Sequence, residues 1–307
     1  MQEKISKHIS DLMTIEPAIR LQFQQQIIEE IQSCHLKSDP LLEDEHEVVP
    51  GIINKYGNRV LCLITTECAA YCRFCTRRRR VGNESGGHAD KNQIDIWEKY
   101  LRENTQISEI ILSGGDPFIV PNDIFANVLN MINKIDNIKV IRIGTRAPSA
   151  DPSLITNEKL KVISQIDKPI YIGIHFEHFS ELTDITKSAI KKLRMSGAIL
   201  YSQTVFLKDI NDDVDVLYRL FNELIENGVR PYYIYRCDPV PGAEHFTVPF
   251  EQEIEIMTEL RKKISGLAYP TYVIDAPDGS GKIPVPLGFW SANTDCYTDF
   301  KGKKHKI

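Results

Sequence analysis

The sequence predicts an α/β protein whose core is a partial or full barrel of parallel strands, preceded by a helical segment. Short apolar runs recur along the chain, and longer segments with helical spacing of apolar residues separate them. Such runs are typical of strands buried on both faces, and their alternation with helices is typical of parallel βα units. The runs are residues 60–65, 109–115, 139–145, 170–176, 199–207 and 230–238, with a candidate seventh at 271–275.

A third observation is that polar residues and glycines follow the apolar runs. In α/β barrels the residues that bind and react lie where strands end and loops begin. The segments in these places are TTEC, SGGD, GTR, HFEH, CDP and DAPDGSGK, in chain order. We therefore expect the functional site at this end of the barrel.

The sequence around the barrel divides into two further parts. Apolar residues before position 35 recur at helical spacing, which predicts two amphipathic helices packed against the rest of the chain. They are Ile5, Ile9 and Leu12 in the first helix, and Phe23, Ile27, Ile28 and Ile31 in the second. We expect an N-terminal helical extension over residues 1–45, the barrel over 46–290 and a short C-terminal tail over 291–307.

Composition excludes several classes of protein. The 307 residues are 42% hydrophobic and 26% charged, with a net charge of −5, which is ordinary for a globular protein. An acidic balance argues against general binding to nucleic acid or to a membrane surface. No stretch approaches the ~18 apolar residues of a membrane span, and the N-terminus lacks a secretory signal. The 7 cysteines fit reduced thiols, so we expect a cytoplasmic protein.

Three cysteines form the sharpest motif. Cys68, Cys72 and Cys75 make a C-x3-C-x2-C pattern in the loop after the first apolar run. Structural zinc takes four protein ligands, and only three are local here. Iron–sulfur clusters also bind thiolates, and three ligands would leave one iron open. A redox pair of Cys72 and Cys75 would leave Cys68 unexplained. An iron–sulfur site is favoured, with zinc and unligated thiols as alternatives.

The segment CRFCTRRRRVG resembles the cluster loop of radical S-adenosylmethionine enzymes, and in particular of the lysine 2,3-aminomutase family. The resemblance extends over roughly residues 46–286 and implies a partial (β/α)6 barrel. It implies a [4Fe–4S] cluster held by Cys68, Cys72 and Cys75, with S-adenosylmethionine at the open iron. It also implies pyridoxal 5′-phosphate as a further cofactor.

The resemblance assigns residues to these cofactors. The segment DAPDGSGK suggests a phosphate loop, but Ala276 and Ile283 stand where a Walker A motif needs Gly and Ser or Thr. Lys282 instead matches the family's pyridoxal-phosphate lysine, and Arg59 matches a residue near that cofactor's phosphate. The residues expected around S-adenosylmethionine and the adjoining cofactor are Ser113, Gly114, Gly115, Asp116, His175, Gln203 and Tyr235.

Further residues are expected to bind the substrate. Arg77 matches the family's ligand for the substrate carboxylate, which a guanidinium can bind through two hydrogen bonds. Asp238 and Asp275 end two late runs; aspartates there are commonly caps, but in this family they bind the far ammonium group of lysine. Two carboxylates favour a basic amino acid. Tyr232 matches a tyrosine near the substrate.

The implied activity is interconversion of L-lysine and β-lysine by 1,2-amino migration, with flavodoxin or ferredoxin as electron donor. The alternatives are an arginine 2,3-aminomutase, an aminomutase acting on a lysyl side chain of elongation factor P, and an RNA-binding zinc knuckle, which the acidic balance disfavours. Longer family members carry a cysteine-rich zinc site in a C-terminal extension, and Asp213 stands where they place an additional zinc cysteine. We expect a short form without that zinc, and a homo-oligomer is compatible with the sequence.

Overall fold

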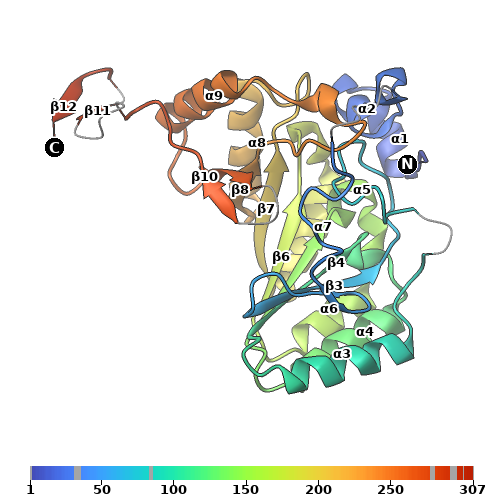
Figure 1. Ribbon diagram of the computed structural model, residues 1–307. Coiled ribbons are helices and arrows are strands. Elements are labelled where there is room, and N and C mark those ends of the chain that lie inside the picture. The colour runs from blue at the N-terminus through green and yellow to red at the C-terminus, as the bar shows by residue number, and fades with distance from the viewer. Residues whose placement is uncertain are drawn as a thin grey trace.

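The computed structural model describes residues 2–30, 36–82, 86–276, 281–290, 296–299 and 301–306. Its centre is a curved ten-stranded sheet covered by helices (Figure 1). The strands are β1 (Glu47–Val49), β2 (Ile52–Ile53), β3 (Arg59–Thr65), β4 (Glu109–Gly114), β5 (Val140–Thr145), β6 (Ile170–His175), β7 (Ile199–Val205), β8 (Arg230–Tyr235), β9 (Thr271–Asp275) and β10 (Lys282–Pro284).

The strands from β3 to β9 run parallel in chain order, which is the arrangement that successive βα units produce. Antiparallel pairing adds β1 and β2 at one edge and β10 at the other. Each of the six predicted runs contains one parallel strand, and the candidate seventh run is β9. Because β1 and β10 are the two edges of the described sheet, the barrel is open, and the prediction of a partial barrel is confirmed.

The two faces of the sheet differ in burial. On β3, the side chains of Val60, Cys62 and Ile64 are buried with the helices, whereas Arg59 and Leu61 on the other face are half-buried. The prediction that the runs are buried on both faces was therefore wrong for the inner face. An open barrel leaves this face without a second layer, and polar side chains occupy part of it. That concave face and its rim hold the candidate site.

Helices connect the strands and cover the outer face (Figure 1). Trp97 of α3 and Phe125 of α4 are fully buried in the same core as the outward residues of the strands. The helices are α3 (Lys91–Glu103), α4 (Asn122–Asn133), α5 (Ala147–Ala150), α6 (Asn157–Ser164), α7 (Asp184–Met195), α8 (Val214–Glu226) and α9 (Phe250–Lys263).

The N-terminal extension contains helices α1 (Lys7–Met13) and α2 (Pro17–Phe23), followed by the 3-10 turn η1 (Ile27–Glu30). Ile9 and Phe23 pack with Ala70 of the cysteine loop, so this extension covers the loop. The second predicted helix ends early, and Ile27 and Ile28 are exposed. After Phe23 the chain leaves the helix, so these two side chains no longer lie on its buried face. Ile31 lies outside the described residues.

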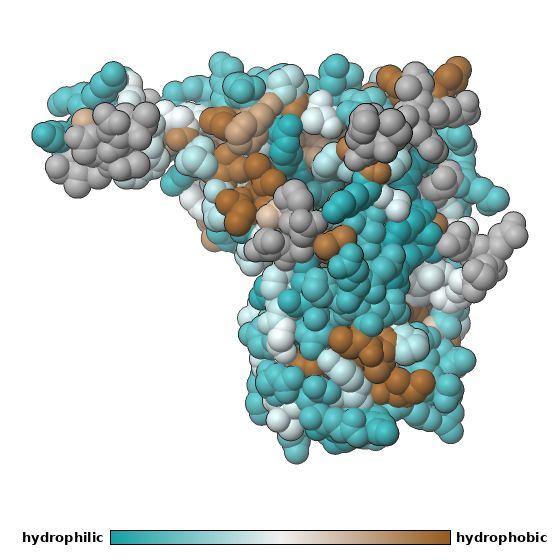
Figure 2. Space-filling view, in the orientation of Figure 1, coloured by the Kyte–Doolittle hydropathy of each residue, from teal (hydrophilic) through white to brown (hydrophobic). Residues whose placement is uncertain are grey.

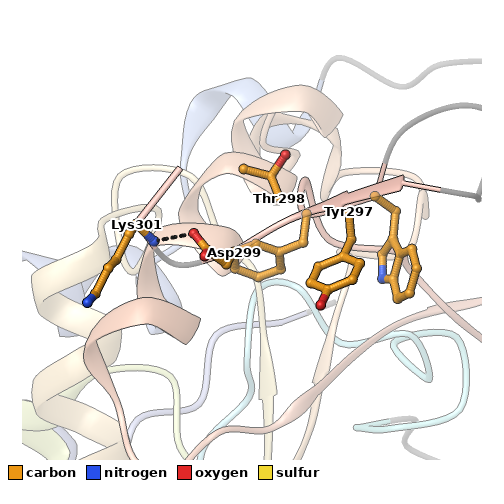
Figure 3. Close-up of a pocket in the computed structure, with 6 residues that line it drawn as sticks. Tyr297, Thr298, Asp299 and Lys301 are labelled. Carbon is orange, nitrogen blue, oxygen red and sulfur yellow. Dashed lines mark hydrogen bonds between the residues drawn. The ribbon is translucent and has the colours of Figure 1, made fainter. Parts of the chain in front are cut away.

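The C-terminal tail forms a hairpin of β11 (Cys296–Thr298) and β12 (Lys304–Lys306), which projects from the body (Figure 1). A pocket of about 590 Å³ lies in this tail (Figure 3), and the backbone N–H of Lys301 donates to Asp299 within it at 2.9 Å. Its lining residues are Phe289, Trp290, Tyr297, Thr298, Asp299 and Lys301. None comes from the barrel strands, so we do not place the reaction there. Among the described helices, none is long and apolar enough to cross a membrane.

Candidate active site at the carboxyl ends of the strands

The loop after β3 brings the three cysteines together. The backbone N–H of Cys75 donates to the carbonyl of Cys72 at 3.2 Å, which closes a tight turn between them. Burial raises the pKa of all three thiols, that of Cys75 to about 11, and the charge of Cys72 and Cys75 contributes to the rise at Cys68. Buried thiols this close to one another are poor thiolates alone, and a cluster that binds them as thiolates would offset that cost. The donor set therefore fits an iron–sulfur cluster.

The number of local cysteines separates the two metal assignments for this loop. Structural zinc takes four protein ligands, whereas the loop has three cysteines, and a cluster can leave one iron open. Among the residues with described positions, no three His, Cys, Asp or Glu side chains are arranged around one metal position, and this holds for iron and zinc alike.

The four arginines after the loop are all paired with acidic side chains. Arg77, expected to bind the substrate carboxylate, holds Glu43 between Nε and Nη2 and donates from Nη1 to Ser113 Oγ at 3.2 Å. The other ion pairs are Arg78–Glu29, Arg79–Asp39, Arg79–Asp44, Arg80–Asp44 and Arg80–Glu47. The acidic segment 39–47 thus neutralises much of the arginine block. Figure 2 shows a largely hydrophilic surface over the middle of the molecule, where Figure 1 labels β3 and β4.

The SGGD segment lies directly against the strand that leads into the cysteine loop. A Cβ on Gly114 would come within 2.2 Å of the Thr65 carbonyl, and one on Gly115 within 2.0 Å of the Glu67 carbonyl. The backbone N–H of Gly115 donates to the Thr65 carbonyl at 2.7 Å. The close packing of the two backbones therefore requires glycine at both positions. From the sequence, these glycines were expected beside S-adenosylmethionine.

Asp116 also has partners that the sequence does not predict. Its carboxylate accepts from the backbone N–H groups of Phe118 and Arg146 and from the Thr145 hydroxyl, at 2.7 to 3.0 Å. Burial raises the pKa of this carboxyl group, although these hydrogen bonds oppose the rise. These hydrogen bonds join the ends of β4 and β5, and the contact of Asp116 with S-adenosylmethionine stays a prediction.

Lys282 and Asp275 form the centre of a second group. Lys282 Nζ lies 2.7 Å from both carboxylate oxygens of Asp275 and 4.9 Å from the centre of the Tyr235 ring. The Tyr235 hydroxyl accepts from Gln203 Nε2 at 2.8 Å. The antiparallel pairing of β9 and β10 places Lys282 opposite Asp275 in register. Residues 277–280 of the loop between these strands lie outside the described residues.

Asp238 is electrostatically coupled to this group. Its pKa is raised to about 7, mainly by burial and then by the nearby charge of Asp275, while Lys282 and Lys55 oppose the rise. Two carboxylates therefore share one partly buried region with a single strong ion pair, Lys282–Asp275. A further cation at this position would be attracted to both.

His175 lies opposite Gln203 in the register of β6 and β7. Its Nδ1 is 3.8 Å from Oε1 of Glu177, a fully buried carboxylate whose other oxygen accepts from the Val205 backbone at 2.6 Å. Oε1 of Glu177 is buried without a hydrogen-bond partner. A buried polar atom left in this way is consistent with a ligand binding beside His175.

Arg59 and Tyr232 lie toward the opposite end of the sheet. Arg59 begins β3, so its Cα is about 20 Å from the end of that strand at ~3.3 Å per residue. Its guanidinium stacks on Tyr56 at 4.1 Å, and the Tyr232 ring packs against Tyr233 at 3.9 Å. Within the described part of the chain, neither residue contacts Lys282, so a cofactor long enough to span the distance would be needed to join them to it.

The chain is similar to proteins of known families. Residues 62–235 match the Radical SAM superfamily. The chain is 41% identical to the L-lysine 2,3-aminomutase of Fusobacterium nucleatum over 270 residues, which are 87% of this chain and 63% of that protein. It is 36% identical to the L-lysine 2,3-aminomutase of Buchnera aphidicola, over 81% of this chain and 73% of that protein. The chain belongs to the lysine 2,3-aminomutase family of the radical SAM superfamily.

Two further similarities concern proteins with other activities. The family also includes a relative named glutamate 2,3-aminomutase, from Clostridioides difficile, at 36% identity over 84% of this chain and 61% of that protein. A radical SAM methyltransferase from Sphaerobacter thermophilus shares the fold, with a TM-score of 0.53 at 14% identity over 74% of this chain and 71% of that one. The chain spans less than two thirds of the length of the Fusobacterium relative.

Family membership brings the cofactors with it. Radical SAM proteins use a [4Fe–4S] cluster and S-adenosylmethionine, and lysine 2,3-aminomutases also use pyridoxal phosphate. The cysteine loop fits the cluster. The Glu177 oxygen without a partner, beside His175, fits a site for S-adenosylmethionine, and the Lys282 amine fits pyridoxal phosphate.

The sequence analysis missed several residues of the site. Lys55 is close enough to Asp275 and Glu43 for both charges to raise its pKa, against a larger lowering by burial. Glu43 binds Arg77, and Arg146 binds Cys72. Two signals for these residues stand in the sequence: the acidic residues of segment 39–47, and the GTR motif at the end of a predicted strand. Neither signal shows which side chain Glu43 or Arg146 contacts.

Proposed function

We propose that this protein interconverts L-lysine and β-lysine by moving the amino group between C2 and C3. One observation carries the proposal: the charge of Asp275 acts on Asp238, and Asp275 pairs with Lys282, so two carboxylates near one lysine would attract a second cation. A lysine substrate supplies that cation in its side-chain ammonium group. Asp275 pairs with Lys282 in this structure. With Lys282 holding pyridoxal phosphate, the side-chain ammonium group of a lysine substrate would pair with Asp275 and Asp238.

Arg77 would fix the other end of the substrate. Glu43 occupies the Nε edge of its guanidinium, whereas Nη1 points to Ser113 on the inner face of β4. The Nη1 side is thus directed toward the concave face, where a substrate carboxylate would replace the Ser113 hydroxyl as its acceptor. Binding both ends holds the carbon atoms between them in one orientation, which lowers the entropic part of the barrier.

The cofactors would be held by the remaining residues. Cys68, Cys72 and Cys75 would bind the cluster, and Ser113, His175 and Gln203 would border S-adenosylmethionine. Lys282 and Tyr235 would hold the pyridoxal ring, with Arg59 toward its phosphate. Together these groups supply radical chemistry and stabilise the migrating nitrogen, and the protein contributes orientation and exclusion of water. We further propose a low-potential donor of single electrons, such as flavodoxin or ferredoxin.

Other substrates are less well supported. Glutamate would place a third carboxylate beside Asp238 and Asp275, where like charges repel. Arginine carries a cation but is longer, and its guanidinium would need the two aspartates farther from Arg77. A lysyl side chain of elongation factor P has no free α-carboxylate of its own to pair with Arg77.

The test is an anaerobic reconstitution with iron, sulfide and pyridoxal phosphate, followed by S-adenosylmethionine and dithionite. L-lysine, L-arginine, L-glutamate and elongation factor P are supplied separately, and products are resolved by mass-detected chromatography. We expect β-lysine from L-lysine and no product from glutamate. The variant Asp275→Asn should lose most of this activity, whereas the matched surface variant Asp215→Asn on α8 should keep it. Rearrangement of arginine or of elongation factor P in place of lysine would refute the substrate assignment.

A further inference from the structure

The cysteine loop has a buried cation in direct contact with one thiol. Arg146 follows β5, and its Nη1 lies 2.8 Å from Sγ of Cys72. The residue is 8% exposed. An arginine remains protonated under all ordinary conditions, so a fixed positive charge is present at this sulfur.

Two parts of the chain hold Arg146 in this position. Its backbone N–H donates to Asp116 at 2.7 Å, which ties it to the SGGD segment. Its Nη2 donates to Glu181 Oε2 at 3.1 Å and to the side-chain oxygen of Gln22. Its guanidinium also lies 4.6 Å from the centre of the Phe23 ring.

The N-terminal extension therefore takes part in this arrangement. Gln22 and Phe23 belong to α2, and the Gln22 carbonyl also accepts from the backbone N–H of Arg73 in the cysteine loop at 2.8 Å. Glu181 belongs to the 3-10 turn η4 (Phe179–Glu181) after β6, and it is fully buried. Helix α2 and η4 thus hold the guanidinium on Cys72 from two sides.

A cation and an N–H donor at a ligand sulfur have a known physical effect on an iron–sulfur cluster. Reduction adds negative charge to the cluster, and both features stabilise the reduced form. The effect is large where water is excluded, because the local dielectric constant is low. A neighbouring carboxylate acts in the opposite direction.

We propose that Arg146 is a positioning residue that raises the reduction potential of the cluster bound at Cys72, and that Glu181 limits this effect. The proposal rests on the proposed role of Cys72 as a cluster ligand. It gives the N-terminal extension a function, because Gln22 helps to hold Arg146 against the sulfur. It also gives a role to a buried arginine that, among the residues with described positions, pairs with one carboxylate, Glu181.

The test measures the reduction potential of the reconstituted full-length protein by electron paramagnetic resonance at a series of poised potentials. In Arg146→Met, the ratio of reduced to oxidised cluster at a fixed poise should fall about tenfold, which is about 59 mV for a one-electron couple. Arg146→Lys keeps the positive charge, so the ratio of reduced to oxidised cluster should fall less in this variant. Glu181→Gln should raise the reduction potential. This change is opposite in sign to that of Arg146→Met, and a loss of folding would not produce it.

A matched control is Arg236→Met, which breaks the ion pair of Arg236 with the buried Glu253. Its potential should equal that of the wild type. Iron and sulfide content are measured for every variant, and Arg146→Lys provides the test if the methionine variant holds no cluster. Unchanged potentials in Arg146→Lys and Glu181→Gln with full iron content would overturn the proposal. A wild-type protein that binds no cluster would instead refute the proposed function, and this inference with it.

Discussion

Arg77 and Glu43 form a two-pronged ion pair in which Nε lies 3.0 Å from both carboxylate oxygens and Nη2 lies 2.6 Å from Oε1. Glu43 is buried and comes from the acidic segment before β3, some 34 residues earlier in the chain. The pair fixes the plane of the guanidinium and leaves Nη1 directed at Ser113. The proposed recognition of the substrate carboxylate by Arg77 would therefore depend on Glu43, a residue placed behind the guanidinium.

The first prediction concerns this pair. Glu43→Gln should raise the KM for L-lysine about tenfold, or about 1.4 kcal/mol, with little change in kcat, because positioning of the carboxylate ligand contributes to binding throughout the reaction. Steady-state kinetics on the reconstituted protein measure it. Glu47→Gln, which affects Arg80 at the edge of the block, is the control and should leave KM unchanged. A lower KM in Glu43→Gln would mean that Glu43 competes with the substrate for Arg77.

The second prediction concerns pH. The pKa of Asp238 is about 7, so this carboxyl group is largely neutral below that pH and must lose its proton to bind an ammonium group. The value of kcat/KM for lysine should therefore fall about tenfold for each pH unit below 7. Asp238→Asn should lower kcat/KM and remove this slope. A slope that persists in the variant would assign the titration to another group.

The same shift affects stability. The folded state binds the Asp238 proton more tightly than the unfolded state, in which the pKa is about 3.9. The contribution of Asp238 to the free energy of unfolding should thus decrease as pH rises from about 4 to 7. Thermal unfolding of the protein without cofactors, compared with Asp238→Asn across this range, measures it. The difference between the two proteins should change in favour of the variant as pH rises.

The fourth prediction concerns the cofactor lysine. Borohydride treatment of the protein with pyridoxal phosphate should attach the cofactor covalently to Lys282, and mass spectrometry of peptides locates it. Lys282→Ala should lose this attachment and the activity. Lys55→Ala removes the neighbouring cation and is the matched control: covalent attachment should remain. Attachment at Lys55 in the wild type would refute the assignment of Lys282.

The fifth prediction concerns the SGGD segment. Gly115→Ala should lower the free energy of unfolding by about 3 kcal/mol, because the added methyl group meets the Glu67 carbonyl at 2.0 Å and neither backbone can move without the other. Gly87→Ala is the control, since nothing lies within 4 Å of a Cβ there. Thermal unfolding compares the two, and equal stabilities would show that the segment can relax.

The strands of the barrel and the cysteine loop were predictable because their signals are local. An apolar run between amphipathic segments predicts a buried parallel strand wherever it packs. Strands β4 to β9 lie within the expected runs, and β3 begins one residue before its run. The spacing of Cys68, Cys72 and Cys75 limits them to one loop in the same way. The second N-terminal helix, expected to include Ile31, ends at Phe23. Glu29 after it pairs with Arg73 of the cysteine loop, a partner distant in the chain that the local pattern does not show.

Partners distant in the chain were decided by the tertiary structure alone. The sequence by itself determined the class of fold, the cysteine loop and the placement of polar residues at strand ends, since each depends on neighbouring residues. It did not determine that Glu43 binds Arg77 or that Arg146 contacts Cys72, which are 34 and 74 residues apart. An ion pair or hydrogen bond forms between groups that are close in the folded chain, and the order of residues in the sequence does not show which distant groups become close.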